Sequence, residues 1–180
     1  MAKAPTTSSR LHHNAHVTTD MEAMRRFYED VIGFPLVATW CEKAELFGKE
    51  RTYMHCFFEV GGGECLAFFQ FADQEDQNEF GPELAPSPFR HLAMKVDQAT
   101  QDGIRERLAA AGYREPDVYV LNHGYCYSLY VSDPSKLLIE FTVDHEDVDT
   151  INADQREKAH RELARWLGGD HSPNNEAYHR

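Results

Sequence analysis

The sequence lacks the features that would direct it to a membrane, to nucleic acid or to a disulfide-stabilised fold. No stretch approaches the ~20 consecutive apolar residues of a membrane span, and the start contains no apolar segment of signal-peptide length. It has no run of lysine or arginine, and its formal net charge is −12, so we expect no binding to nucleic acid or to anionic membranes. The four cysteines form no CxxC pair. We therefore expect a soluble cytoplasmic protein with reduced thiols.

What is present fits one ordinary folded domain. The chain has 180 residues, of which 42% are hydrophobic and 12% aromatic, enough for a core. Residues 1–9 are small and polar and predict a disordered tail. The acidic, proline-containing stretch ADQEDQNEFGPELAPSP predicts a linker between two halves. We expect a domain over residues 10–144, with modules 10–72 and 88–144, and a C-terminal helix and tail over 145–180.

The first half reads as one strand, one helix and three strands. Residues 12–17 predict the first strand, and Asp20 can cap a helix over 21–33 that ends at Gly33. Alternating apolar residues and the turn GGG predict the further strands, at 36–42, 53–60 and 64–71.

The second half repeats this plan. A strand in HLAMKVD precedes a helix in QATQDGIRERLAAAG, and strands follow at 117–121, 125–131 and 137–143. His13 lies seven residues before Asp20, and His91 lies six before Asp97. The repeat predicts an α+β fold, in which two tandem βαβββ modules form a half-open mixed β-barrel around a metal cavity. The helix in INADQREKAHRELARWLGG carries apolar residues at helical spacing, so we expect it to dock on the domain or on another subunit.

Three residues from separate strands predict a metal site. In RLHHNAHVTTD, strand alternation separates His13 from His12 and His16. His91 has the corresponding place in the second half, and Glu140 lies in the apolar strand LLIEF, where an unpaired carboxylate is costly to bury. Each histidine alone is better explained as a hydrogen-bonded strand residue. Two imidazoles and one carboxylate together favour a metal with open positions, Fe(II) first, although the ligand types also admit Mn(II), Zn(II) and Ni(II).

These motifs carry a family resemblance. HHNAHVTTDMEAMRRFYEDVIGF resembles the opening of the vicinal oxygen chelate superfamily, which includes glyoxalases, bleomycin-resistance proteins and extradiol dioxygenases, and RHLAMKVD and YVSDPSKLLIEF resemble its second-half signatures. The resemblance covers about residues 11–144 and implies that His13, His91 and Glu140 are the metal ligands. It also implies a homo-oligomer, commonly a homodimer. Lys136 departs from the usual glycine of the last turn.

The resemblance is closest to short, single-domain extradiol dioxygenase-like members. Setting CLAFFQF against LLIEFTV pairs Phe68 with Glu140, at a position where similar glyoxalase-type lyases usually carry a second Glu. Three ligands leave room for a bidentate substrate and O2. We therefore expect a ring-cleaving dioxygenase of aromatic catabolism that acts on a catechol-like aromatic diol. The alternatives are a glyoxalase-like lyase or isomerase that uses the same ligands without O2, and a non-enzymatic protein that binds a small molecule such as an antibiotic.

Five further residues are candidates for catalysis or substrate binding. His123 is a candidate acid/base, because imidazole exchanges protons near neutral pH, or else it caps a turn. Tyr130, ten residues before Glu140, is a candidate hydrogen-bond partner of the substrate or a half-buried strand residue. The candidate substrate-binding residues are His55, Phe57 and Phe68, and core packing explains the two phenylalanines at least as well.

Overall fold

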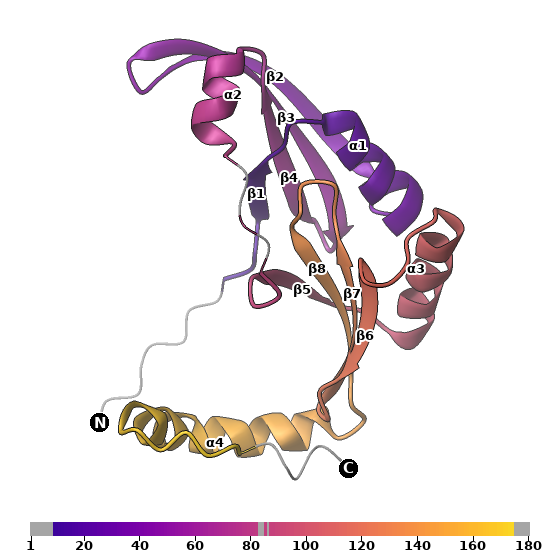
Figure 1. The fold of residues 1–180 in the computed structure, drawn as a ribbon, viewed down its shortest axis with the longest axis vertical. Helices are drawn as coiled ribbons and strands as arrows, with labels where there is room; N and C mark the ends of the chain where they lie inside the picture. The colour runs from indigo at the N-terminus through magenta and orange to yellow at the C-terminus, as the bar shows by residue number, and fades with distance from the viewer. Residues whose placement is uncertain (1–8, 83–84, 86, 175–180) are drawn as a thin grey trace. The chain divides into compact units, whose positions relative to one another are not determined.

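The computed structural model describes residues 9–82, 85 and 87–174 (Figure 1). Nearly all of the predicted disordered tail, residues 1–9, lies outside the described residues. The contacts divide the chain into two compact units. The first comprises Met1–Ala85 and Asp133–Lys136, and the second comprises Pro86–Ser132 and Leu137–Arg180.

The first unit is a four-stranded mixed sheet with helices. Its strands follow the order β1-β4-β3-β2, in which β1 runs parallel to β4 and the other neighbours are antiparallel (Figure 1). The elements are β1 (His13–Val17), α1 (Met21–Arg25), η1 (Arg26–Ile32), β2 (Leu36–Leu46), β3 (Lys49–Gly61), β4 (Glu64–Phe71) and α2 (Gln74–Phe80).

The second unit has the same plan. Its strands follow the order β5-β8-β7-β6, with β5 parallel to β8. The elements are β5 (His91–Lys95), α3 (Gln98–Ala110), β6 (Val118–Asn122), β7 (Cys126–Ser132), β8 (Leu138–Asp144) and α4 (Val148–Leu167). The predicted α+β fold of two βαβββ modules followed by a C-terminal helix is therefore confirmed. Within the described residues, each module is an open mixed sheet.

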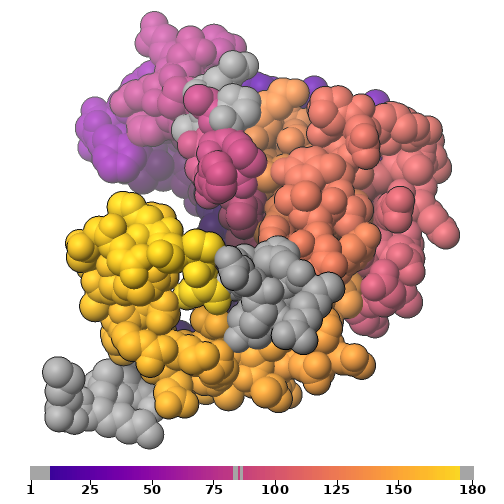
Figure 2. All heavy atoms as spheres, turned by 60° about the horizontal axis from the view of Figure 1, so that its bottom comes forward, coloured from indigo at the N-terminus to yellow at the C-terminus, as the bar shows by residue number. Residues whose placement is uncertain are grey.

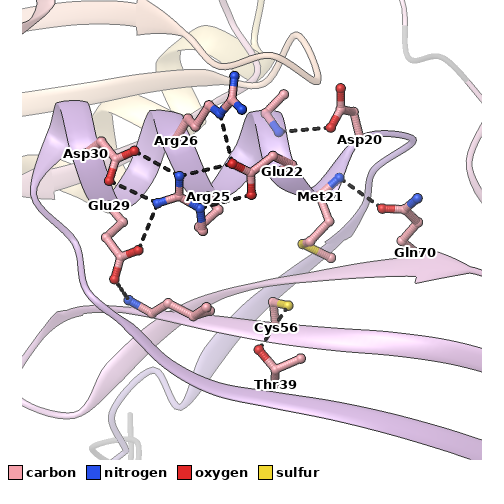
Figure 3. Close-up of polar contacts among 12 residues, drawn as sticks. Asp20, Met21, Glu22, Arg25, Arg26, Glu29, Asp30, Thr39, Cys56 and Gln70 are labelled. Atoms are coloured by element: carbon pink, nitrogen blue, oxygen red, sulfur yellow. Dashed lines mark hydrogen bonds and ion pairs between the residues drawn. The ribbon is translucent and has the colours of Figure 1, made fainter.

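The first helix begins and ends where the sequence predicts, but its winding changes halfway. The Asp20 carboxylate accepts a hydrogen bond from the Ala23 amide at 2.9 Å, and Gly33 ends the helix with φ of 95°. Between them, α1 continues into η1, which is wound as a π-helix. Arg25 donates hydrogen bonds to Glu22, Asp30 and Glu29, three carboxylates within one or two turns of it (Figure 3). Such pairs stabilise the exposed side of the helix.

The buried side of this helix covers one face of the first sheet. The rings of Tyr28 and Phe68 stack with centroids 5.2 Å apart, and both side chains are fully buried. The Tyr28 hydroxyl donates a 2.8 Å hydrogen bond to Asp133. This bond helps to explain why the turn Asp133–Lys136, which the sequence assigns to the second module, groups with the first unit.

The predicted linker over residues 72–88 contains a helix that the sequence analysis missed. α2 is capped by Asp73, whose carboxylate accepts from the amides of Glu75 and Asp76 at 3.0 and 3.1 Å. Asp76 is buried and pairs with the buried Arg51 of β3 and with Lys49. Two of the acidic residues of the predicted linker therefore form a cap and a buried ion pair.

No side chain of α4 is buried. Figure 2 shows this helix at the surface, in orange to yellow. Leu163 and Trp166 are 56% and 54% exposed, and Leu167 is also exposed. The expected docking of this helix on the domain is therefore not observed, and docking on another subunit stays a prediction. None of the helices in the described part of the chain combines the length and the apolar composition that a membrane span requires.

Candidate metal-binding site

A polar cluster lies on one face of strands β7 and β8. The antiparallel register makes Tyr130 the cross-strand partner of Glu140, and Ser128 the partner of Thr142. Because side chains two residues apart share a face, all four lie side by side. Glu140 is only 6% exposed and Ser128 is fully buried. The carboxylate is thus held among hydroxyl groups on this face of the sheet.

His91 reaches this carboxylate from β5, which runs parallel to β8. Its Nε2 atom lies 3.0 Å from the Oε2 atom of Glu140. Its Nδ1 atom lies 3.0 Å from the carbonyl oxygen of Pro88. Since a carbonyl oxygen only accepts, the Nδ1 atom must carry the hydrogen of this bond. The lone pair of Nε2 then faces a lone pair of Oε2. The two repel each other unless a proton or a metal ion lies between the two atoms.

The spacing of these two atoms fits a shared metal ion. Nitrogen and oxygen ligands lie about 2.0–2.2 Å from a divalent cation. Two such ligands at right angles about the cation are therefore about 3 Å apart, which matches the distance between His91 and Glu140. A carbonyl that fixes the Nδ1–H tautomer of a histidine is also the usual support for a metal ligand.

The hydrogen bonds around Glu140 favour its ionised form. Burial raises the pKa of this carboxyl group, but hydrogen bonds from Ser128, Tyr130 and Thr142, and the nearby His91, outweigh burial and hold the pKa below its ordinary value. Thr142 donates to Oε1 at 3.0 Å. Glu140 is therefore a carboxylate at neutral pH, as a metal ligand must be.

His123 and Tyr130 form a hydrogen-bonded pair beside this carboxylate. The His123 Nε2 atom lies 2.9 Å from the hydroxyl of Tyr130, the cross-strand partner of Glu140. Burial, and then Glu140, raise the pKa of Tyr130, so the phenol stays protonated at neutral pH. Either the Nε2–H group of His123 donates to the phenol oxygen or the phenol donates to Nε2, depending on the tautomer of His123. In both cases the Nδ1 atom is the ring nitrogen that Tyr130 leaves unengaged.

In the first unit, three of the predicted residues share one face of the sheet. The His13 ring lies 6.0 Å from His55 and 5.5 Å from Phe57, measured between centroids. His55 stacks on Phe69 at 3.6 Å, and its Nε2 atom is buried without a hydrogen-bond partner among the described residues. Burial, and then the nearby His13, lower the pKa of His55. His55 is therefore neutral at pH 7 and faces the same side as His13.

The prediction that Phe68 is the first-half counterpart of Glu140 is wrong by one residue. His91 pairs with Leu138, two residues before Glu140, whereas His13 pairs with Cys65, two residues before Ala67. The first-half counterpart of Glu140 is therefore Ala67. Phe68 points to the opposite, helix-covered face, where it packs on Tyr28, so the structure does not group it with the candidate substrate-binding residues. Alanine, like phenylalanine, offers no second carboxylate, so the expectation of three protein ligands stays a prediction.

The other two histidines of the opening cluster behave differently from each other. His16 lies on the helix-covered face with its ring 6.1 Å from Phe68, as strand alternation predicts. Burial lowers its pKa, while Asp133 acts in the opposite direction. His12 was expected to point away from His13, but the two Nδ1 atoms are 2.7 Å apart. His12 precedes β1, so strand alternation does not govern its side chain.

The structure thus brings together His91, Glu140, His123 and Tyr130 in the second unit. His13 belongs to the first unit, and its role as the third ligand stays a prediction. The sequence analysis missed Ser128 and Thr142. Ser128 lies two residues before Tyr130, and Thr142 two residues after Glu140, so the period of two along a strand could have revealed both.

Comparisons with known proteins agree with this fold. A profile of the Glyoxalase/Bleomycin resistance protein/Dioxygenase superfamily matches residues 10–141, so the chain belongs to this superfamily. The structure is similar to the fosfomycin resistance protein FosX from Listeria monocytogenes, with a TM-score of 0.55 and 16% identity over 79% of this chain and 98% of that chain. It is also similar to a glyoxylase/bleomycin resistance protein/dioxygenase domain from Frankia sp. EAN1pec, with a TM-score of 0.53 and 18% identity over 78% and 95%. At these identities the likeness concerns the fold alone. No curated protein sequence matches significantly.

Proposed function

We propose that this protein is a metal-dependent enzyme whose cation is held by His91 and Glu140, with His13 as the third ligand. The observation that carries the proposal is the 3.0 Å approach of the His91 Nε2 atom to the Glu140 Oε2 atom while Pro88 accepts from the Nδ1 atom of His91. Two lone pairs held this close need a proton or a metal ion between them, and we propose the metal ion. Two imidazoles and one carboxylate make Fe(II) our first choice, with Mn(II), Zn(II) or Ni(II) as alternatives.

The residues beside the carboxylate supply proton transfer. His123 accepts a proton from a hydroxyl group of the substrate at Nδ1 and returns it later, and Tyr130 holds the opposite ring nitrogen in place. Tyr130 remains a phenol throughout, because burial and Glu140 raise its pKa. The bound cation would polarise the substrate oxygens as a Lewis acid and, as Fe(II), support chemistry with O2.

Among reactions of the superfamily, we propose oxidative ring cleavage of a catechol-like aromatic diol with O2. Two features support this choice. The first module has Ala67 where a second carboxylate would add a fourth ligand, and fewer ligands leave more positions for a diol and O2. The rings of His55, Phe57 and Phe69 line one face of the first sheet and offer planar surfaces to an aromatic ligand.

A lyase or isomerase of the glyoxalase type is the second candidate. The His123–Tyr130 pair favours it as much as ring cleavage, because a proton relay beside a bound cation needs no O2. A small-molecule binding protein without catalysis would need neither the pair nor the cation.

Anaerobic reconstitution with Fe(II) followed by a panel of catechols under air tests the proposal. We expect oxygen uptake together with a yellow ring-opened product. Turnover that persists without O2 would identify the lyase or isomerase. Metal content of the protein as purified, compared with that of Glu140→Ala, tests the metal centre separately. Absence of oxygen uptake with every catechol in a metal-loaded protein would overturn the ring-cleavage proposal.

A further inference from the structure

We infer that Ser128 and Thr142 are positioning residues that hold Glu140 as a ligand through one oxygen only. The inference rests on the proposed metal centre. The hydroxyl groups of these two residues lie on the same sheet face as Glu140 and orient its carboxylate. Neither hydroxyl group is itself a proposed ligand.

The hydrogen bonds divide the two oxygens of Glu140 between two tasks. Thr142 donates from Oγ1 to Oε1 at 3.0 Å, whereas Oε2 lies 3.0 Å from the Nε2 atom of His91. The Ser128 hydroxyl lies 3.1 Å from Thr142 Oγ1; because Thr142 gives its one hydroxyl hydrogen to Glu140, Ser128 donates to Thr142 and supports this bond from behind. Oε1 is therefore engaged by the strand face, and Oε2 points to the other proposed ligand.

The surroundings make this orientation difficult to change. Ser128 is fully buried, and its Oγ atom is 3.7 Å from the Sγ atom of the buried Cys126. Ser128 and Thr142 are directly opposed across β7 and β8, so the ladder between these strands fixes their separation. A rotation that turned Oε1 toward His91 would break its hydrogen bond with Thr142 at a carboxylate that is itself buried.

The number of oxygens that Glu140 contributes decides how many coordination positions stay open. A carboxylate that binds through both oxygens occupies one position more than a carboxylate that binds through one. By engaging Oε1, Ser128 and Thr142 keep that position for the substrate. We therefore expect these hydroxyls to affect both the affinity for the cation and the number of water molecules bound to it.

Titration with Mn(II) alone tests the inference without any turnover. Thr142→Val removes the hydroxyl at nearly constant shape, and Thr142→Ser restores it. Thr39→Val is the matched control, because Thr39 is a strand threonine of the first unit that bonds to Cys56 at 3.4 Å. We expect Mn(II) to bind about 10- to 100-fold more weakly to Thr142→Val, with Thr142→Ser and Thr39→Val close to the unmodified protein. Water-proton relaxation should report fewer exchangeable water molecules on Mn(II) in Thr142→Val.

The outcomes separate this inference from the proposed function. If the unmodified protein and His91→Ala bind Mn(II) equally weakly, the metal centre itself is wrong. If only His91→Ala loses affinity and Thr142→Val keeps both affinity and water count, the positioning role is wrong. Equal losses in Thr142→Ser and Thr142→Val would also overturn it, because the serine keeps the hydroxyl. Ser128→Ala offers a second test, since it weakens the same arrangement from the neighbouring strand.

Discussion

The His123 Nε2 atom lies 2.9 Å from the hydroxyl of Tyr130, which is itself the cross-strand partner of Glu140. This chain of contacts connects a turn between two strands to the buried carboxylate. Substitutions along it can distinguish the two proposed roles, namely holding a cation and moving a proton.

Replacing His123 should remove proton transfer and keep the cation. We expect His123→Ala to lower the rate about 10²- to 10⁴-fold, with Mn(II) affinity nearly unchanged, because His123 contacts Tyr130 and is not a proposed ligand. The exposed histidine of α4 provides a control, His160→Ala, which should leave both quantities unchanged. Steady-state kinetics and Mn(II) titration measure the two effects. A matching loss of cation affinity in His123→Ala would contradict this assignment.

Replacing Glu140 should remove both functions together. Glu140→Gln keeps the size of the side chain but replaces a carboxylate oxygen with an amide group. We expect Mn(II) affinity to fall by more than about 100-fold, since changes next to a ligand alone cost about 10- to 100-fold. Calorimetric titration measures the affinity, and thermal melting without metal checks that the variant is folded. Unchanged Mn(II) binding would exclude Glu140 as a ligand.

The hydrogen bond between Tyr28 and Asp133 should stabilise the first unit. Both residues are buried, and the bond is 2.8 Å long. Tyr28→Phe removes the donor at nearly constant volume, so we expect the free energy of unfolding to fall by about 1–3 kcal/mol. Urea unfolding measures this change. Tyr127→Phe, at a tyrosine that is 43% exposed, should change stability by less than about 0.5 kcal/mol, and equal effects of the two variants would argue against the bond.

Stability should fall in mildly acidic solution, in part because of His16. Burial lowers the pKa of His16 in the folded chain, so the unfolded chain binds the proton at a higher pH. The contribution of His16 is fully present above the ordinary histidine pKa of about 6.5 and is lost as the pH falls from there through the folded value. His16→Gln should therefore flatten the profile of unfolding free energy between neutral and mildly acidic pH. A profile with unchanged slope would show that His16 is not responsible.

The C-terminal helix should contribute little to the stability of the single chain. Leu163 and Trp166 are more than half exposed, and no side chain of α4 is buried. We expect Trp166→Ala to change the free energy of unfolding by less than about 0.5 kcal/mol at low protein concentration. Sedimentation of this variant also tests the predicted homodimer, since a helix that docks on another subunit would make its dissociation depend on Trp166. Strong destabilisation at low concentration would instead show that α4 packs within the chain.

Sequence patterns predicted the elements that depend on neighbouring residues. Asp20 and Gly33 marked both ends of the first helix, because capping and positive φ are local requirements. The helix α2 was missed because its acidic residues resemble those of a solvated loop. Only the fold supplies the buried Arg51 that pairs with Asp76. Tertiary contacts likewise underlie the assignment of the turn at Asp133 to the first unit.

The candidate site was predictable where strand periodicity and composition both applied. Glu140 stood out as a carboxylate in an apolar strand, and His91 followed from the repeat. The pairing of Phe68 with Glu140 is off by one residue because residue patterns alone do not reveal strand register, and a shift of one residue along a strand reverses the face. The register of β1 with β4 was needed to identify Ala67. The role of Pro88 depends on a carbonyl oxygen, which no side-chain pattern reveals.

The position of Ala67 in the duplicated fold has a consequence for how the protein can evolve. It occupies in the first sheet the place that Glu140 occupies in the second, and alanine codons that end in a purine become glutamate codons by one nucleotide change. With such a codon at Ala67, one mutational step would give the two halves matching carboxylates. This step would add a carboxylate beside the proposed ligands without rebuilding either sheet.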